Sequence, residues 1–190
     1  MKAVLAASNL LNRILERIAD WSGWLFVVLA VVICFDVFTR KVGLQLPGLE
    51  STRLQELEWH LHTVMFSMWM GHCYLLNAHP RVDSFTTSLP LRKKAWIELI
   101  GCLVFALPYC YVLVYYGIPF VKVSYVTNEI SDAVTGLTHR WIIKGLFVVG
   151  LVLLAVAVVS TILRLIVFLF GRDQAREVAL PIERSSAPLV

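Results

Sequence analysis

The chain has 190 residues, of which 58% are hydrophobic and 16% are charged, and its mean hydropathy is +0.74. A soluble domain averages about 45–50% apolar and about 25% charged residues, so this composition argues against a water-soluble core and against intrinsic disorder. The net charge of +4 is spread over the chain, which favours loop charges that set membrane topology over nucleic-acid binding. We therefore expect an all-α integral membrane protein.

Residues 1–20 are predicted to form a short cytoplasmic amphipathic helix. Leu11, Ile14, Leu15 and Ile18 recur at i, i+3, i+4 and i+7, which places one apolar face on a helix. No small-residue cleavage site follows the first long apolar run, so the segment is not a cleaved signal peptide. We expect this helix to lie in the membrane surface before the chain enters the bilayer.

Four transmembrane helices are predicted next, in one domain of residues 21–170. Their spans are about 21–39, 59–78, 96–119 and 141–170, with the third span broken by Pro108 and ending at Pro119. At about 1.5 Å per residue, roughly 19 residues of helix match the thickness of a hydrocarbon core. A flexible cytoplasmic tail, residues 171–190, is expected to follow.

The distribution of lysine and arginine predicts the orientation. With the N-terminus in the cytoplasm, eleven of the 17 basic residues lie inside and six lie outside. The positive-inside rule then places both termini in the cytoplasm. The cluster Arg92, Lys93 and Lys94, in the short loop between spans two and three, is the strongest single topology anchor.

An acidic residue lies near the outer end of the first span. Asp36 and Arg40 are four residues apart, so they share a helix face and can form an ion pair. A charge near the membrane centre costs about 2.5–3.5 kcal/mol, which favours a paired structural role for Asp36. The functional alternative is a proton or cation relay, as in a small proton-coupled exporter, and it depends on this one buried acid.

A second group of polar residues stands where span two begins. Glu56 with His60, and Glu58 with His62, are both pairs at i, i+4. One hypothesis is a b-type haem anchor of a respiratory enzyme, with His139 opposite one of these histidines. The simpler interpretation is an amphipathic segment at headgroup level that leads into the span, and we favour it.

The remaining polar candidates lie at the ends of spans two and four. His79, Pro80, Arg81 and Asp83 close span two on the cytoplasmic side, where Pro80 cannot continue the helix. The outer loop before span four carries Glu129 and Asp132, followed by the basic Arg140. This loop is either solvated or faces a soluble partner.

The sequence contains no pattern that predicts catalysis, a cofactor or a metal site. It has no glycine-rich phosphate loop, no Ser-His-Asp order and no zinc-ligand spacing. All four cysteines lie inside apolar runs and are expected to be small buried hydrophobic residues, which disfavours a disulfide-forming membrane enzyme. We expect a scaffold or accessory subunit and not an enzyme.

Several stretches of this sequence resemble one family of membrane proteins. They occur in the following order along the chain: Asp36-Val37-Phe38-Thr39-Arg40, Leu54-Gln55-Glu56-Leu57-Glu58-Trp59, His79-Pro80-Arg81-Val82-Asp83, Asn128-Glu129-x-Ser131 and Gly136-Leu137-Thr138-His139-Arg140-Trp141. Taken together with the four predicted spans and the two cytoplasmic termini, these stretches resemble the small permease subunit of tripartite ATP-independent periplasmic (TRAP) transporters. This is the DctQ-like family, and the resemblance is to its longer-chain branch. The resemblance covers about Ala19 to Arg164.

The resemblance implies a multi-pass protein of the bacterial inner membrane with two protein partners. One is a large DctM-like permease subunit, which in this family carries the sodium and substrate sites. The other is a periplasmic substrate-binding protein that delivers an organic acid. The chain itself would be the scaffold that stabilises the large subunit in a secondary transporter.

The resemblance also implies roles for the matched residues. Arg40 and Glu56 would lie near the outer interface, and Arg81 and Asp83 would order the cytoplasmic turn. Glu129, Asp132 and Arg140 are candidates for contacting the binding protein or the outer surface of the large subunit.

Overall fold

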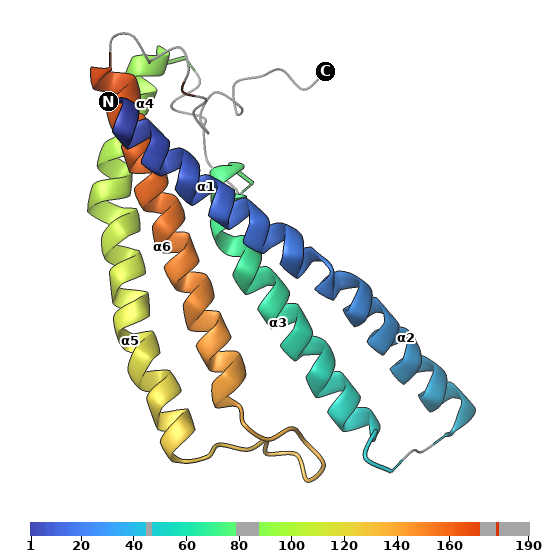
Figure 1. The fold of residues 1–190 in the computed structure, drawn as a ribbon. Helices are drawn as coiled ribbons and strands as arrows, with labels where there is room; N and C mark the ends of the chain where they lie inside the picture. Colours follow the sequence, from blue (N-terminus) through green and yellow to red (C-terminus); the bar gives the residue numbers. More distant parts are fainter. Residues whose placement is uncertain (45–46, 79–87, 172–177, 179–190) are drawn as a thin grey trace. The chain divides into compact units, whose positions relative to one another are not determined.

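A computed structural model describes residues 1–44, 47–78, 88–171 and 178, and every regular element among them is helical (Figure 1). The elements are α1 (Lys2–Gly23), α2 (Leu25–Val42), α3 (Ser51–Leu75), α4 (Leu91–Gly101), the π-helix η1 (Cys102–Ala106), α5 (Leu107–Val126) and α6 (Trp141–Phe170). The all-α prediction is confirmed for this part of the chain.

Three helical segments among the described residues are long and apolar enough to cross a membrane. They are Lys2–Val42, Leu91–Val126 and Trp141–Phe170. The helix α3 has 25 residues and is long enough, but its first turns carry Arg53, Glu56 and Glu58, which lower its mean hydropathy. Length and composition therefore support a membrane protein and leave α3 as the ambiguous segment.

The junction between α1 and α2 keeps a helical backbone. Trp24 has φ −63° and ψ −23°, and the N–H groups of Val27 and Val28 both donate to its carbonyl oxygen. The chain from Lys2 to Val42 is thus one helical segment of 41 residues, interrupted only by a turn residue at Trp24.

Two prolines shape the segment formed by α4, η1 and α5. In η1 the Leu107 N–H reaches the Cys102 carbonyl five residues back, which widens the helix just before Pro108. A proline ring collides with the carbonyl four residues back, and a π-turn gives it room. Pro119 lies inside α5, and the helix continues to Val126, so the helix does not end at Pro119 as the sequence suggested.

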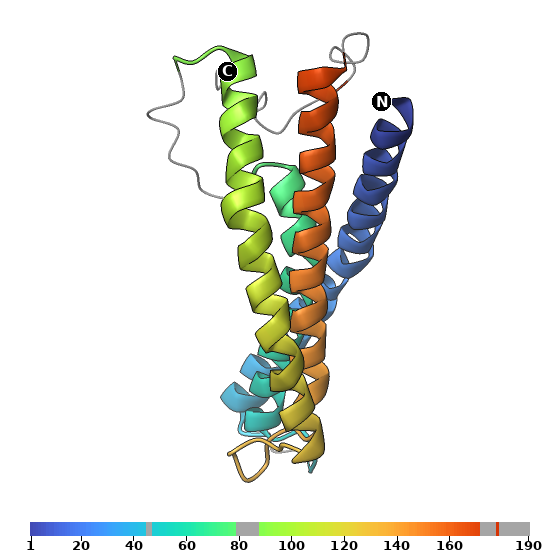
Figure 2. The same cartoon turned by 90° about the vertical axis from the view of Figure 1, so that its left-hand side faces the viewer.

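The chain divides into two compact units. The first unit comprises Met1–Arg17, Met70–Leu113 and Leu151–Val190. Its core contains Ala95, Leu99, Cys102 and Cys110 from α4, η1 and α5, packed with Val158, Ile162 and Leu165 from α6. Figure 2 shows α5 beside α6 from a second direction.

The second unit comprises Ile18–Trp69 and Val114–Gly150. Leu29, Leu54 and Met65 are buried in it. A Cβ atom added at Gly150 would stand 2.6 Å from the Ser67 carbonyl oxygen, so α6 and α3 approach closely here and only glycine fits. Small residues at such a contact are typical of helix packing in membranes.

The four cysteines are free thiols, but they are not equally buried. Cys102 and Cys110 are core residues of the first unit, as their apolar surroundings predicted. Cys34 is exposed on α2, so the expectation of a buried side chain was wrong there. An apolar run places a residue in a helix without saying which face it occupies.

Candidate functional site

Asp36 joins the end of α2 to the start of α3. Its carboxylate is fully buried, and the Arg40 guanidinium pairs with it at 2.7 Å. The Ser51 hydroxyl, on the first residue of α3, donates to the other carboxylate oxygen at 2.8 Å. The ion pair predicted from the i, i+4 spacing is present, and Ser51 adds a second partner that the sequence did not reveal.

Two helices of the second unit end in the same left-handed cap. Gly43 follows α2 with φ +70°, and Asn128 follows α5 with φ +46°. At each end the N–H of the residue after the cap reaches back five residues, from Leu44 to Thr39 and from Glu129 to Ser124. These bonds form Schellman motifs, in which asparagine tolerates the backbone that glycine otherwise supplies. Asn128 therefore fixes the start of the loop of residues 127–140.

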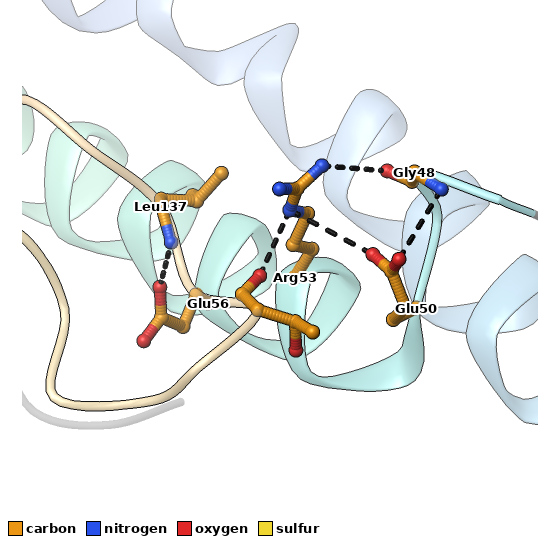
Figure 3. A network of polar contacts seen from close by, with 6 residues as sticks. Gly48, Glu50, Arg53, Glu56 and Leu137 are labelled. Carbon is orange, nitrogen blue, oxygen red and sulfur yellow. Dashed lines mark hydrogen bonds and ion pairs between the residues drawn. The ribbon is translucent and has the colours of Figure 1, made fainter.

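The turn before α3 is held to that loop by Arg53. Its Nε donates to the Thr135 carbonyl at 2.8 Å, and it lies 3.7 Å from a Glu50 carboxylate oxygen (Figure 3). Glu50 in turn accepts the Gly48 N–H at 3.3 Å, and Arg53 also donates to the Gly48 carbonyl. Hydrogen bonds from the backbone N–H groups of Glu50 and Gly48 lower the pKa of the Glu50 carboxyl, and the charge of Arg53 adds to this effect. Together they outweigh the partial desolvation of Glu50, which raises its pKa.

Glu56 is the second residue of α3 that holds the loop. Its buried carboxylate accepts the Leu137 backbone N–H at 2.5 Å (Figure 3). It also accepts the Ser131 hydroxyl. Gly136 stands between Ser131 and Glu56, because a Cβ there would collide with the Ser131 side chain and lie 2.9 Å from the Glu56 carboxylate. The carboxylate thus organises the loop from within.

The charged form of Glu56 is favoured by these contacts. Burial is the largest single influence and raises the pKa of Glu56, but the hydrogen bonds from Ser131 and Leu137, with the charges of Arg140 and His60, outweigh it. The net result is a lowered pKa. Glu56 is therefore ionised, and bound to the loop, at neutral pH.

Glu129 and Lys144 form a second link, between the loop and the start of α6. The Lys144 ammonium pairs with the Glu129 carboxylate, and both side chains are largely shielded from solvent. The hydrogen bond from Lys144 is the largest cause of the lowered pKa of Glu129. Of the loop acids predicted as partner contacts, Glu129 is engaged within the chain, whereas Asp132 is exposed.

An open pocket of about 280 Å³ lies beside this link, within the second unit. Its lining is mostly aromatic and aliphatic, with three charged groups and a histidine: Trp59, His60, Thr63, Phe120, Glu129, Arg140, Ile143, Lys144 and Phe147. The Arg140 guanidinium lies 5.9 Å from the centre of the Trp59 ring, and the Lys144 ammonium lies 4.1 Å from that of Phe120. Both cations are thus placed over aromatic rings.

Glu58 lies away from the loop and near the Asp36 pair. Burial, followed by the negative charge of Asp36, raises the pKa of Glu58, while Arg40 opposes the shift. The two glutamates predicted as a cluster therefore have different surroundings and opposite pKa shifts. Glu56 contacts the loop, and Glu58 lies in the field of Asp36.

The histidines of the haem hypothesis have protein partners. His60 Nδ1 bonds the Glu56 carbonyl oxygen, the His62 ring lies 5.9 Å from Phe66, and His139 Nδ1 bonds the Thr138 hydroxyl. In the described part of the chain, no group of three or more His, Cys, Asp or Glu side chains is arranged to hold a metal ion.

The other candidate residues from the sequence lie in the first unit or outside the residues that the structure describes. Arg92 and Lys93 are exposed in the first turn of α4, and Lys94 is half-buried. His79, Arg81 and Asp83 lie outside the described residues.

The first unit contains a polar cluster that sequence reasoning missed. Ser8 of α1 and Ser160 of α6 are both fully buried, and their hydroxyls lie 2.8 Å apart. Arg164 donates to the Ser8 hydroxyl at 3.1 Å and to the Asn9 amide oxygen at 2.7 Å. Asn12 lies 2.5 Å from the Ser160 hydroxyl. The only sequence signal was Arg164 itself, a cation inside an apolar run, which requires partners.

The fold defines a helical membrane protein whose described helices meet through buried polar side chains. A family model described as "Tripartite ATP-independent periplasmic transporters, DctQ component" matches residues 29–168. The chain belongs to this family, so it is the small subunit of a TRAP transporter and a transporter component. No curated protein and no solved structure gives a significant match.

Proposed function

We propose that the chain is the scaffold that stabilises the large DctM-like permease subunit of a sodium-coupled transporter for an organic acid. The observation that carries this proposal is the family match over residues 29–168. The substrate-binding protein and the large subunit would supply the substrate site and the coupling ion. The chain would supply a fixed surface in the membrane.

In this proposal α3 also crosses the membrane and completes the four transmembrane helices, as the second of them in chain order. Its polar residues are concentrated in its first turns, and the run from Trp59 to Leu75 has no formal charge. Arg53 and Glu56 bind the loop of residues 127–140, so these two charges of α3 have partners inside the protein near one membrane surface. That surface would be the periplasmic one, with both termini in the cytoplasm.

The helix α5 is the best candidate for the face that meets the large subunit. In the first unit, Phe105 at the end of η1 and Tyr109 and Val112 of α5 follow at i, i+4 and i+7 and are 72%, 62% and 47% exposed. Tyrosine is favoured at protein interfaces because it adds a hydrogen-bonding hydroxyl to a large apolar ring. Tyr109 falls near the middle of the predicted span, where lipid offers that hydroxyl no partner.

Co-purification tests this proposal. A tagged chain, solubilised in mild detergent, is expected to retain a larger membrane protein in fixed stoichiometry. Tyr109→Ala should weaken that retention, whereas Phe26→Ala should not, although Phe26 on α2 is a comparably exposed aromatic at 59%. Isolation of the chain alone under all conditions would contradict the scaffold role, and the reverse order of the two variants would show that α5 is not the contact face.

A further inference from the structure

The pocket of the second unit has the composition of an amphiphile site. Its walls come from three helices: Trp59 and Thr63 on α3, Phe120 on α5, and Ile143 and Phe147 on α6. These walls are mainly apolar, while Arg140 and Lys144 bring two positive charges to the same space. A ligand that fits both features has an anionic head and an apolar body.

One of the two cations, Arg140, forms no direct ion pair, although its charge acts on Glu56 and Glu129. Lys144 pairs with Glu129, which neutralises it. The Arg140 guanidinium lies over the Trp59 ring, and within the described residues it forms no ion pair. The charged groups that line the pocket therefore leave one positive charge in excess. A planar guanidinium suits a phosphate group, which it can bind through two parallel hydrogen bonds.

The aromatic residues around the pocket indicate its depth in the membrane. Tyr125 and Trp141 pack edge to face at 5.2 Å, at the end of α5 and the start of α6. Trp59, on the pocket wall, is 52% exposed. Tryptophan and tyrosine gather at the membrane–water boundary, so the pocket lies at headgroup level once α3, α5 and α6 span the bilayer.

We propose that this pocket binds the phosphate of an anionic phospholipid. Arg140 would contact the phosphate, and Trp59, Phe120 and Phe147 would contact the glycerol and the first carbons of the acyl chains. At about 280 Å³ the pocket is slightly smaller than typical small-molecule sites, which suits a headgroup whose chains leave through the open side. The proposal depends on the membrane placement of these helices, not on the identity of the large subunit.

Native mass spectrometry of the delipidated full-length chain tests this site. Phosphatidylglycerol is the probe, and phosphatidylcholine, inorganic phosphate and a free dicarboxylate are the comparisons. We expect phosphatidylglycerol to bind more tightly than each of them. Arg140→Gln should weaken its binding about tenfold, because a hydrogen-bonded charge contact is lost. Lys122→Gln is the matched control, since Lys122 is an exposed cation near the end of α5 and outside the pocket.

Three results would overturn the proposal. Equal binding by the wild type and Arg140→Gln would remove Arg140 from the site. An equal loss in Lys122→Gln would reduce the effect to general surface charge. Inorganic phosphate or the dicarboxylate binding as tightly as the lipid would indicate an anion site without a lipid.

A second measurement covers the case in which Arg140→Gln does not fold. The wild-type chain is labelled with a phosphatidylglycerol that carries a photoreactive group at the start of one acyl chain. We expect label on peptides that contain Thr63 or Ile143, and label confined to other peptides would contradict the site.

Discussion

At the scale of single residues, the protein places carboxylates where they bind backbone as well as side chains. Glu56 accepts a backbone N–H from Leu137, and Asp36 ties α2 to α3 through Ser51. A buried carboxylate that loses such donors is left with its full desolvation cost. The loop of residues 127–140 should therefore depend on the ionised form of Glu56.

The first prediction concerns pH. Glu56 and Glu129 both have a pKa below the ordinary value of 4.5, so their ionisation stabilises the folded state above pH 4.5. This stabilisation is lost as the pH falls through the lowered pKa values. Thermal unfolding in detergent between pH 7 and pH 3 should show the loss, and the double variant Glu56→Gln with Glu129→Gln should flatten the profile. Asp132→Asn, at an exposed acid in the same loop, should leave the profile unchanged.

The second prediction concerns the cap at Asn128. A left-handed backbone costs a residue with a Cβ and no compensating polar group about 1–2 kcal/mol, and glycine avoids that cost. Asn128→Ala should therefore lower the unfolding temperature, and Asn128→Gly should keep or raise it. If the two variants lowered it equally, the asparagine would be needed for its side-chain contacts and not for its backbone.

At the scale of elements, buried polar contacts and close glycine contacts decide which helices meet. The i, i+4 pair of Asp36 and Arg40 could be predicted because both residues belong to one helix. The contact of Glu56 with Leu137 could not, because 81 residues separate them and nothing local to α3 specifies the loop. The amphipathic pattern of α1 predicted a helix, but its buried face includes Ser8, which the apolar stripe did not contain.

The third prediction concerns the docking of α1 on α6. Arg164→Leu removes the donors to Ser8 and Asn9 and should weaken the contact by about 1–3 kcal/mol, because buried acceptors lose a charged partner. Hydrogen exchange of the α1 amides is expected to become faster. Arg17→Gln, an exposed arginine on α1, serves as the control. Unchanged exchange in Arg164→Leu would mean that apolar packing alone holds α1.

The fourth prediction compares two glycines of α6. Gly150→Ala places a Cβ 2.6 Å from the Ser67 carbonyl and should cost roughly 1–3 kcal/mol through overpacking against α3. Gly145→Ala meets only Val121 at an ordinary 3.8 Å and should be neutral or slightly stabilising, because alanine favours a helix. Thermal unfolding of both variants in one detergent gives the comparison, and equal stability would contradict the close contact.

At the scale of the whole molecule, composition predicted the class of protein and left its contacts open. The apolar excess indicated membrane helices, and three segments meet that criterion. The helix α3 does not, because its three histidines and other polar side chains keep its hydropathy low even beyond the charges of its first turns. Arg53 and Glu56 add to this low hydropathy, and the same two side chains bind the loop of residues 127–140.

The exposed apolar surface and the few charges are what membrane helices of this family require, whether lipid or a partner covers them. A subunit that holds a larger one must present such a surface in the membrane, and its polar residues can then serve its own folding. The ion pairs and hydrogen bonds described above connect helices and loops of this chain. They leave the exposed face of α5 available to a partner.

Uptake into proteoliposomes is the most direct test of the scaffold function. Vesicles would contain the large subunit alone, this chain alone, or both, with the substrate-binding protein and the organic acid outside under a sodium gradient. The account predicts sodium-dependent uptake when both subunits are present, none with this chain alone, and a large subunit that aggregates or loses activity without it. Uptake by this chain alone, or a large subunit equally stable and active without it, would contradict the account.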